Sequence, residues 1–552
     1  MPRMKTIVNA IVRWGWLTLL VLFAFGYLAA GLSEPQNELQ NQGSGQLSDA
    51  SLKDLNHVET ILAKTWENQG LERTEYADWL TVCRRMSLAM VGSGLSVEEI
   101  RFLESLPEDQ RESVHLESLL LDSRFHHYWS ERWSRFLVGA DEGPFLVYRR
   151  RRFRIWLYEQ FASDRRYDEI VRRLVNAEGL WTDRPEVNFL TVTFDSNDGQ
   201  PDPVRLAART SRAFLGLRID CLQCHDDFLG NVSLGDIESP REGLQSDFHQ
   251  LAAFFSAAKT NGFQGVQESE ADYRYQYLDS DEDVDVEPAV PYSPELLPDE
   301  GSSRSRLAAW ITHPENRQAA RAAVSHVWAL LFGRSATESV DNLPLDQSAP
   351  EVIEALADEF IASEFDLRHL IRLIVKSSAF RVSSRAVFLV TDEHEKANAV
   401  FPLTRLRPEQ VAACVIQSSR IKTIDRDSSF VTQLQKFGST NDFVKRYGDI
   451  GEDEFTNESV TITQRLVMLN GNMLKESISD NPIMNASSHI DLFAPTDDLA
   501  IEMAYLSVLN RRPSESERVH FGERISNAEF RRQAIEDIFW VLLNSTELAW
   551  NH

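Results

Sequence analysis

The sequence has few cysteines and comparatively few basic residues, and each shortage excludes a class of protein. Four cysteines among 552 residues are too few for a disulfide framework. Lys and Arg total 57 against 84 Asp and Glu, which gives a formal net charge of −27. Nucleic-acid binding depends on basic surface that displaces counterions from phosphates. We therefore expect no nucleic-acid partner, while the acidic surface permits a cationic one.

Several catalytic and metal-binding motifs are also missing. GxSxG, HExxH and P-loop patterns do not occur, so no catalytic residues are predicted and enzymatic activity stays an open question. No second CxxC or HxxxH is present to complete a four-ligand zinc site. The acidic run at 279–285 fails as an EF-hand loop, because Val284 and Val290 stand where glycine and glutamate are needed. No fixed-period repeat is evident, which excludes a solenoid.

Against this background one short motif stands out, the sequence Cys-Leu-Gln-Cys-His at 221–225. Two thiols three residues apart lie on one side of a helical turn and can form thioethers to the vinyl groups of one haem, with the next histidine as iron ligand. We predict a covalently bound haem c held by Cys221 and Cys224, with His225 on the metal. Two alternatives remain, a disulfide or redox pair of the cysteines, and a harder metal on His225, Asp226 and Asp227.

The second axial ligand of such a haem is not specified by spacing. The side chains considered for it are Met86, Met90, His126, His127 and His249. The other two cysteines, Cys83 and Cys414, lie in apolar helical patterns and are predicted to be small buried side chains. The basic run at 148–154 is predicted to be a solvated helix face, and His326 and His369 are predicted to be core or interface residues.

The N-terminal segment, 1–32, contains 19 residues without charge from Trp14 to Leu32. Such a run is long enough to cross a bilayer as a helix. Basic residues before it favour a cytoplasmic N-terminus. A cleaved signal peptide is the alternative, because small residues follow the apolar run. We predict a single-pass protein of the cytoplasmic membrane, with a polar tether at 33–51 and the bulk of the chain in the periplasm.

The rest of the chain shows mostly helical periodicity. Ser96 and Glu99 form a predicted capping box, Trp129, Trp133 and Phe136 share one helical face, and Gly216 is placed to end a helix. We predict a mainly α fold, with two helical domains behind an N-terminal transmembrane anchor and little β structure.

The predicted domain limits follow from composition. A cytochrome-c-like CxxCH domain is expected at 52–261, an acidic connection rich in Pro and Tyr at 262–303, and a C-terminal helical domain at 304–552. Short strands are expected near Val284 within the connection.

Residues 212–228 and 247–255 together resemble the planctomycete cytochrome-c-like domain of unknown function, the fifteen-forty-nine family, whose pattern contains CxxCH. Segments of the C-terminal half resemble its usual partner, the fifteen-fifty-three family; they include 306–334, 340–344, 364–384, 405–411 and 464–474. Cys221, Cys224 and His225 match the pattern position for position. The chain departs from it at Asp227, where the family has His, and at Ser325-His326, where it has Asn-Arg.

The resemblance implies an exported protein of planctomycete-type bacteria, of a kind often encoded beside cytochrome-like and polysaccharide-degrading proteins. It implies no settled activity. We therefore expect an exported, membrane-tethered c-type haem protein that transfers electrons. The alternative is an extracellular polysaccharide-binding or processing module whose CxxCH is a metal site or a structural disulfide. The expected partners are the inner membrane, a redox protein and a polysaccharide.

Overall fold

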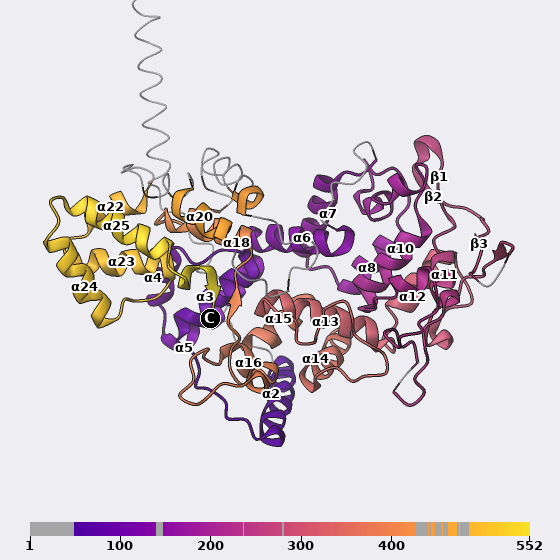
Figure 1. Ribbon diagram of the computed structural model, residues 1–552, viewed down its shortest axis with the longest axis horizontal. Coiled ribbons are helices and arrows are strands. Elements are labelled where there is room, and N and C mark those ends of the chain that lie inside the picture. The colour runs from indigo at the N-terminus through magenta and orange to yellow at the C-terminus, as the bar shows by residue number, and fades with distance from the viewer. Residues whose placement is uncertain are drawn as a thin grey trace, which may run out of the picture. The chain divides into compact units, whose positions relative to one another are not determined.

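The computed structural model describes residues 49–139, 147–235, 237–278, 281–425 and 485–552, with shorter stretches between 428 and 478. All of them belong to one compact unit, Gln46–His552. The N-terminal helices (Figure 1) are α2 (Asp49–Gln69), α3 (Trp79–Val91), α4 (Val97–Glu104), α5 (Glu108–Leu121), α6 (Ser123–Val138), α7 (Arg150–Ala162), α8 (Tyr167–Val175), α9 (Asn188–Thr191), α10 (Pro203–Thr210) and α11 (Gln245–Ala253).

The second half of the chain is helical as well. Its helices are α12 (Ser303–Ile311), α13 (Arg317–Phe332), α14 (Glu351–Ala362), α15 (Leu367–Lys376), α16 (Ser378–Arg381), α17 (Asp392–Lys396), α18 (Pro408–Ser418), α20 (Ile462–Asn470), α22 (Ala486–Phe493), α23 (Asp497–Leu509), α24 (Glu515–Ser526) and α25 (Arg531–Leu543). The mainly α class predicted from periodicity is confirmed.

Short strands occur only as antiparallel pairs in the part of the chain that the structure describes. The pairs are β1 (Ala258–Thr260) with β2 (Val266–Glu268), β3 (Arg274–Tyr275) with β4 (Val284–Asp285), and β5 (Thr404–Arg405) with β6 (Trp550–Asn551). Their registers align Lys259 with Gln267, Tyr275 with Val284, and Thr404 with Asn551. The strand expected near Val284 is thus present as β4.

Local sequence explains where α4 begins and which face of α6 is buried. The Ser96 hydroxyl accepts a hydrogen bond from the Glu99 backbone N–H at 3.0 Å, and the Glu99 carboxylate accepts one from the Ser96 N–H at 2.7 Å. This is the predicted capping box. On α6, Trp129 and Trp133 are buried and Phe136 is partly buried, which confirms the predicted aromatic face.

Helix α13 lies within the larger hydrophobic core. It is buried at 14 of its 16 residues and packs against α3, α14, α15 and the π-helical turn η4 (Ser211–Leu215). A helix that is buried on all sides is typical of a core position. The core extends from Val58 to Phe401, so residues on both sides of the predicted acidic connection contribute to it. The domain limits at 262–303 stay predictions.

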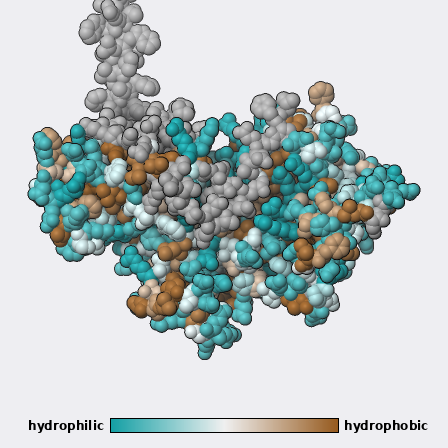
Figure 2. Space-filling view, viewed as in Figure 1, coloured by the Kyte–Doolittle hydropathy of each residue, from teal (hydrophilic) through white to brown (hydrophobic). Residues whose placement is uncertain are grey.

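A second core is formed by α18 with α22 to α25. Val411, Tyr505 and Phe539 are among its buried residues. The outer faces of α22 and α25 carry apolar side chains, with Phe493 71% and Trp540 40% exposed. Figure 2 shows brown residues gathered over this helical group.

Arg85 of α3 connects the N-terminal helices to the C-terminal residue and to the end of α16 through hydrogen bonds. Its guanidinium donates hydrogen bonds to the carbonyls of Phe380, Val382 and His552 at 2.7–2.8 Å, and it lies 3.6 Å from the centre of the Phe401 ring. Burial lowers the pKa of Arg85 to about 9. A buried cation is tolerated here because carbonyl dipoles and an aromatic face replace its hydration.

One part of the predicted fold class is wrong. The prediction placed the helical domains behind a transmembrane anchor, but among the described residues no helix has both the length and the apolar character needed to span a bilayer. The longest one near the N-terminus, α2, has polar and charged residues on most of its surface. Segments 1–32 and 33–48, on which the anchor and most of the tether were placed, lie outside the described residues.

Candidate functional site at the CxxCH turn

The chain reaches the CxxCH turn through a helix that ends at a glycine. The carboxylate of the N-cap, Asp202, accepts hydrogen bonds from two backbone N–H groups in the first turn of α10. The helix continues as η4 and stops at Gly216, which is left-handed with φ 60°. A Cβ at this position would lie 2.9 Å from a methyl carbon of Leu343. Glycine therefore satisfies both the backbone and the packing, and the predicted helix end is confirmed.

The two cysteines lie on a short 3₁₀-helical turn, η5 (Asp220–Gln223). The Cys224 backbone N–H donates to the Cys221 carbonyl at 3.3 Å, which closes the turn. With three residues per turn, side chains at positions i and i+3 lie on the same side. Both cysteines are exposed and free, whereas Leu222 between them is fully buried. The turn therefore presents a pair of thiols to solvent and anchors itself through Leu222.

The Gln223 carbonyl is held from behind by three donors. They are His249 Nε2 at 3.0 Å, the Gln245 side-chain amide at 3.1 Å and the Tyr275 hydroxyl at 3.1 Å. Because Nε2 of His249 donates, its Nδ1 accepts from the Tyr273 hydroxyl at 2.9 Å. The His249 ring stacks on Tyr275 at 3.4 Å, and burial lowers its pKa. This neutral, fully bonded network fixes the backbone of the turn.

His225 is exposed, and its ring orientation is set by a local hydrogen bond. Its Nδ1 lies 2.7 Å from the Asp226 carbonyl. A carbonyl only accepts, so Nδ1 carries the proton and Nε2 keeps its lone pair. This is the tautomer in which histidine binds a metal through Nε2, with the other nitrogen donating to an outer-shell oxygen.

The two aspartates that follow His225 have structural partners. Asp227 is 3% exposed, and its carboxylate accepts hydrogen bonds from two backbone N–H groups at 2.6 and 3.2 Å. Asp226 accepts from the backbone N–H of Gln245 at 2.7 Å. In the part of the chain that the structure describes, no group of three His, Cys, Asp or Glu is placed to hold a metal ion. The structure therefore does not support the alternative of a harder metal on His225, Asp226 and Asp227.

The acidity of the thiols bears on the redox alternative. Partial burial, with the negative charge of Asp227, raises the pKa of Cys221 above its usual value. A reactive dithiol pair needs the opposite, because the thiolate is the nucleophile. Cys221 therefore lacks the electrostatic surroundings of the attacking thiol in a thiol–disulfide oxidoreductase.

Exposed apolar side chains flank the motif. Phe228 is 79% and Leu229 is 84% exposed, and the Phe228 ring lies 6.3 Å from that of His225 at an interplanar angle of 21°. Large apolar groups side by side on a surface indicate a contact site. A porphyrin needs two accessible thiols, one metal-binding nitrogen and apolar contact. The residues of this turn supply all three, so the residue set fits a haem.

Residues 57–260 match the model of the PSCyt2 family, described as a protein of unknown function (DUF1549), and the CxxCH turn lies within that range. Residues 303–442 match the PSD1 family, also described as a protein of unknown function (DUF1553). The chain is a PSCyt2–PSD1 protein. The PSCyt2 region ends at the last residue of β1, and the PSD1 region begins with α12. No curated protein and no solved structure matches the chain.

The other side chains considered as second axial ligands lie elsewhere or are already engaged. Met86 and Met90 are buried in α3. His126 bonds to the Leu120 carbonyl, and the ring of His127 packs on that of Tyr158 at 4.3 Å. His249 touches the turn, but both of its ring nitrogens are hydrogen-bonded. None of these contacts assigns the ligand.

The remaining predictions have separate outcomes. Cys83 and Cys414 are buried, as predicted, and burial raises the pKa of both thiols. In the basic run, Arg151 is exposed, while Arg154 pairs with Glu131 at 2.7 Å. The solvated face is therefore confirmed only in part.

Sequence reasoning did not find the network behind the turn. Tyr273 and Tyr275 lie in the segment predicted to be a connection, and Gln245 had no motif around it. The one feature of the sequence that could have indicated this network is the cluster of tyrosines at 273, 275 and 277. It also did not find an arginine-lined cavity next to the motif, described below.

Proposed function

We propose that this chain is a c-type haem protein that carries one haem on the exposed CxxCH turn. Cys221 and Cys224 form the two thioethers, and His225 binds the iron through Nε2. The haem supplies one-electron chemistry when bound. The chain holds the attachment turn rigid, keeps the ligand histidine in one tautomer and leaves the site open to an electron partner.

The proposal rests on the placement of three groups at one short turn. The thiols of Cys221 and Cys224 are free and exposed, and Nε2 of His225 keeps its lone pair, while the buried side chain of Leu222 anchors the turn. Thioether formation needs both sulfurs accessible on the same side of the backbone. Metal binding needs the Nε2 lone pair, which the bond from Nδ1 to the Asp226 carbonyl leaves available.

The position of the turn at the protein surface supports electron transfer rather than the binding of a small ligand at an enclosed haem. An attachment turn at the surface lets a partner protein approach the haem edge, and the formal net charge of −27 favours a basic partner. Covalent attachment to CxxCH takes place outside the cytoplasm, so the proposal includes export of this part of the chain to the periplasm.

The test is expression of the full chain in a host that contains a haem-ligation system. We expect a pyridine haemochrome spectrum of the c type and an intact mass increased by one haem. Cys414→Ala is the matched control, because Cys414 is buried far along the sequence from the motif, and it should keep the haem. Wild-type protein that has no haem, whether its thiols are reduced or joined in a disulfide, would overturn the proposal.

A further inference from the structure

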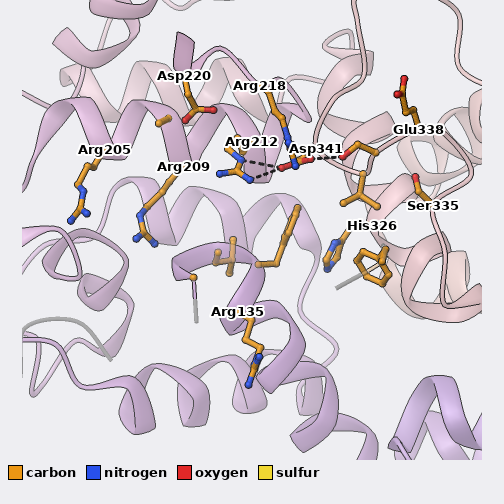
Figure 3. Close-up of a pocket in the computed structure, with 17 residues that line it drawn as sticks. Arg135, Arg205, Arg209, Arg212, Arg218, Asp220, His326, Ser335, Glu338 and Asp341 are labelled. Carbon is orange, nitrogen blue, oxygen red and sulfur yellow. Dashed lines mark hydrogen bonds and ion pairs between the residues drawn. The ribbon is translucent and has the colours of Figure 1, made fainter. Parts of the chain in front are cut away.

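A cavity of about 220 Å³ lies beside the CxxCH turn, and five arginines line it. It is bounded by α6, by α10 with η4, by α13 and by the loop 335–341 (Figure 3). Asp220, the residue before Cys221, also lines the cavity. The two cysteines of the motif and His225 do not line it. Drug-sized ligands occupy pockets of about 300 Å³ or more, so this space fits a smaller molecule.

Three of the arginines come from one helical face. Arg205, Arg209 and Arg212 are spaced four and three residues apart along α10 and η4, which places them on the same side. In Figure 3 Arg212 lies against Asp341, Arg205 and Arg209 extend side by side from the same helix, and Arg135 points away from them. Arg205 pairs with Asp195 at 3.2 Å, and Arg135 lies 3.5 Å from Glu131. Arg209 and Arg212 line the cavity from this face, and Arg212 is also bonded to Asp341.

Asp341 orders the upper part of the cavity. Its two carboxylate oxygens accept hydrogen bonds from Arg212 at 3.0 Å and Arg218 at 2.9 Å, and Ser339 donates to it at 2.6 Å. Burial alone would raise the pKa of Asp341, but the hydrogen bonds from Ser339, Arg218 and Arg212 lower it below its ordinary value. One carboxylate thus fixes two guanidinium groups and still leaves the lining arginines in excess of the lining acids.

His326 is the second, independent sign of a ligand. Its side chain is 2% exposed, it lines the cavity, and neither ring nitrogen has a hydrogen-bond partner among the described residues. The ring stacks on Phe136 at 3.7 Å and meets Trp133 edge-on at 4.7 Å. Leaving a buried polar group of this kind without a hydrogen-bond partner lowers stability, so its retention requires a reason.

The protonation state of His326 limits which chemical groups of a ligand can bond to it. Burial lowers its pKa to about 3, with Arg407 acting in the same direction and Asp341 opposing it. A neutral imidazole has one N–H donor and one bare acceptor nitrogen. A hydroxyl group can pair with whichever of the two faces the cavity, because it both donates and accepts. A carboxylate can only accept, and an ammonium group is repelled by the arginines.

We propose that this cavity binds a small hydroxylated oxyanion, a sugar acid or sugar phosphate no larger than one hexose unit. Its charged group lies against Arg209 and Arg212, whose planar guanidinium groups match carboxylate and phosphate oxygens. One of its hydroxyls bonds to His326. The cavity is thus a binding site separate from the CxxCH turn, and it does not depend on haem being bound there.

Titration calorimetry on the full chain tests this with four probes: glucuronate, glucose 6-phosphate, glucose and inorganic phosphate. We expect one site for glucuronate or glucose 6-phosphate, with a Kd of about 1 mM or tighter. Comparison of these two anions shows whether the oxyanion is a carboxylate or a phosphate. Glucose should not bind at the same concentration, and inorganic phosphate should bind more weakly than the preferred sugar anion. Absence of binding by both sugar anions would overturn the proposal, and equal binding of glucose would do the same.

Two variants and one control locate the binding. His326→Phe keeps the aromatic packing and removes the unsatisfied nitrogens, so the protein should fold while the Kd rises by about tenfold or more. Arg209→Gln should weaken binding by at least as much. Arg274→Gln removes an exposed arginine that pairs with Asp285 on the β3–β4 hairpin, and it should leave the Kd unchanged. A folded His326→Phe protein with wild-type affinity would rule out this site.

Discussion

The CxxCH turn and the arginine cavity are neighbours that are built in opposite ways. The turn is contiguous, open to solvent and held by neutral hydrogen bonds to one backbone carbonyl. The cavity is assembled from five separate parts of the chain and holds several charges around a buried, neutral imidazole. A covalent attachment site needs its reactive groups adjacent in sequence, whereas a reversible site needs only that they converge in space. The contrast explains why one site has a recognisable motif and the other has none.

The contrast between the turn and the cavity is tested most directly by a variant that abolishes one function and keeps the other. In the double variant Cys221→Ser, Cys224→Ser we expect haem attachment to fall to zero, because serine forms no thioether. Both side chains are exposed, so the free energy of unfolding should change by no more than about 0.5 kcal/mol per site. Haemochrome spectra and chemical denaturation measure the two effects. Sugar-anion binding in the cavity should survive, and its loss would show that the two sites are one.

A second prediction concerns acid stability, and it sharpens the description of the cavity. The folded-state pKa of His326 is about 3, below the ordinary value of 6.5. Below pH 6.5 the unfolded chain takes up a proton that the folded chain does not, so stability is lost as the pH falls toward 3. Between pH 7.5 and 4.5 wild-type protein should lose about 3 kcal/mol more than His326→Phe.

Denaturation midpoints at several pH values measure this difference in the slope of stability. His520→Gln is the control, because His520 is exposed on α24 and its replacement should leave the slope as in the wild type. Parallel profiles for wild type and His326→Phe would mean that His326 is already charged or partnered in the folded protein.

A third prediction tests whether the turn is as preorganised as its contacts indicate. Asp227→Ala removes a buried carboxylate that accepts two backbone hydrogen bonds in the loop after the motif. Two N–H groups then lose their partner, which should cost about 2 kcal/mol of unfolding free energy. We expect faster hydrogen exchange at residues 226–232 and a lower yield of attached haem. Unchanged exchange in this loop would contradict the proposed role of Asp227.

The smallest expected effect concerns the balance of charge in the cavity. Asp341→Asn keeps the size of the side chain but removes one negative charge beside Arg212 and Arg218. Both arginines are partly exposed, so solvent screening limits the change to about 1 kcal/mol. The sugar anion should bind several-fold more tightly by calorimetry. Weaker binding would mean that Asp341 positions the arginines more than it competes with the ligand.

Much of the local structure could be predicted from particular residues. The capping box at Ser96, the aromatic face of α6 and the helix end at Gly216 all follow from interactions within a few residues. The CxxCH motif is of the same kind, because its chemistry depends on an i, i+3 relation. The anchor prediction came from hydropathy alone and drew on no contact with the rest of the chain, and the described helices do not support it.

What the sequence determined by itself is short in range: the helical class, the positions of caps and the pairing of two thiols with one histidine on a single turn. Only the tertiary structure decided that the thiols face solvent while Leu222 faces the core, and that Tyr273 and Tyr275 hold the turn from behind. Only it brought His326 within reach of arginines more than 100 residues earlier in the chain. The physical reason is that backbone geometry relates near neighbours directly, whereas distant side chains meet only through the packing of whole helices.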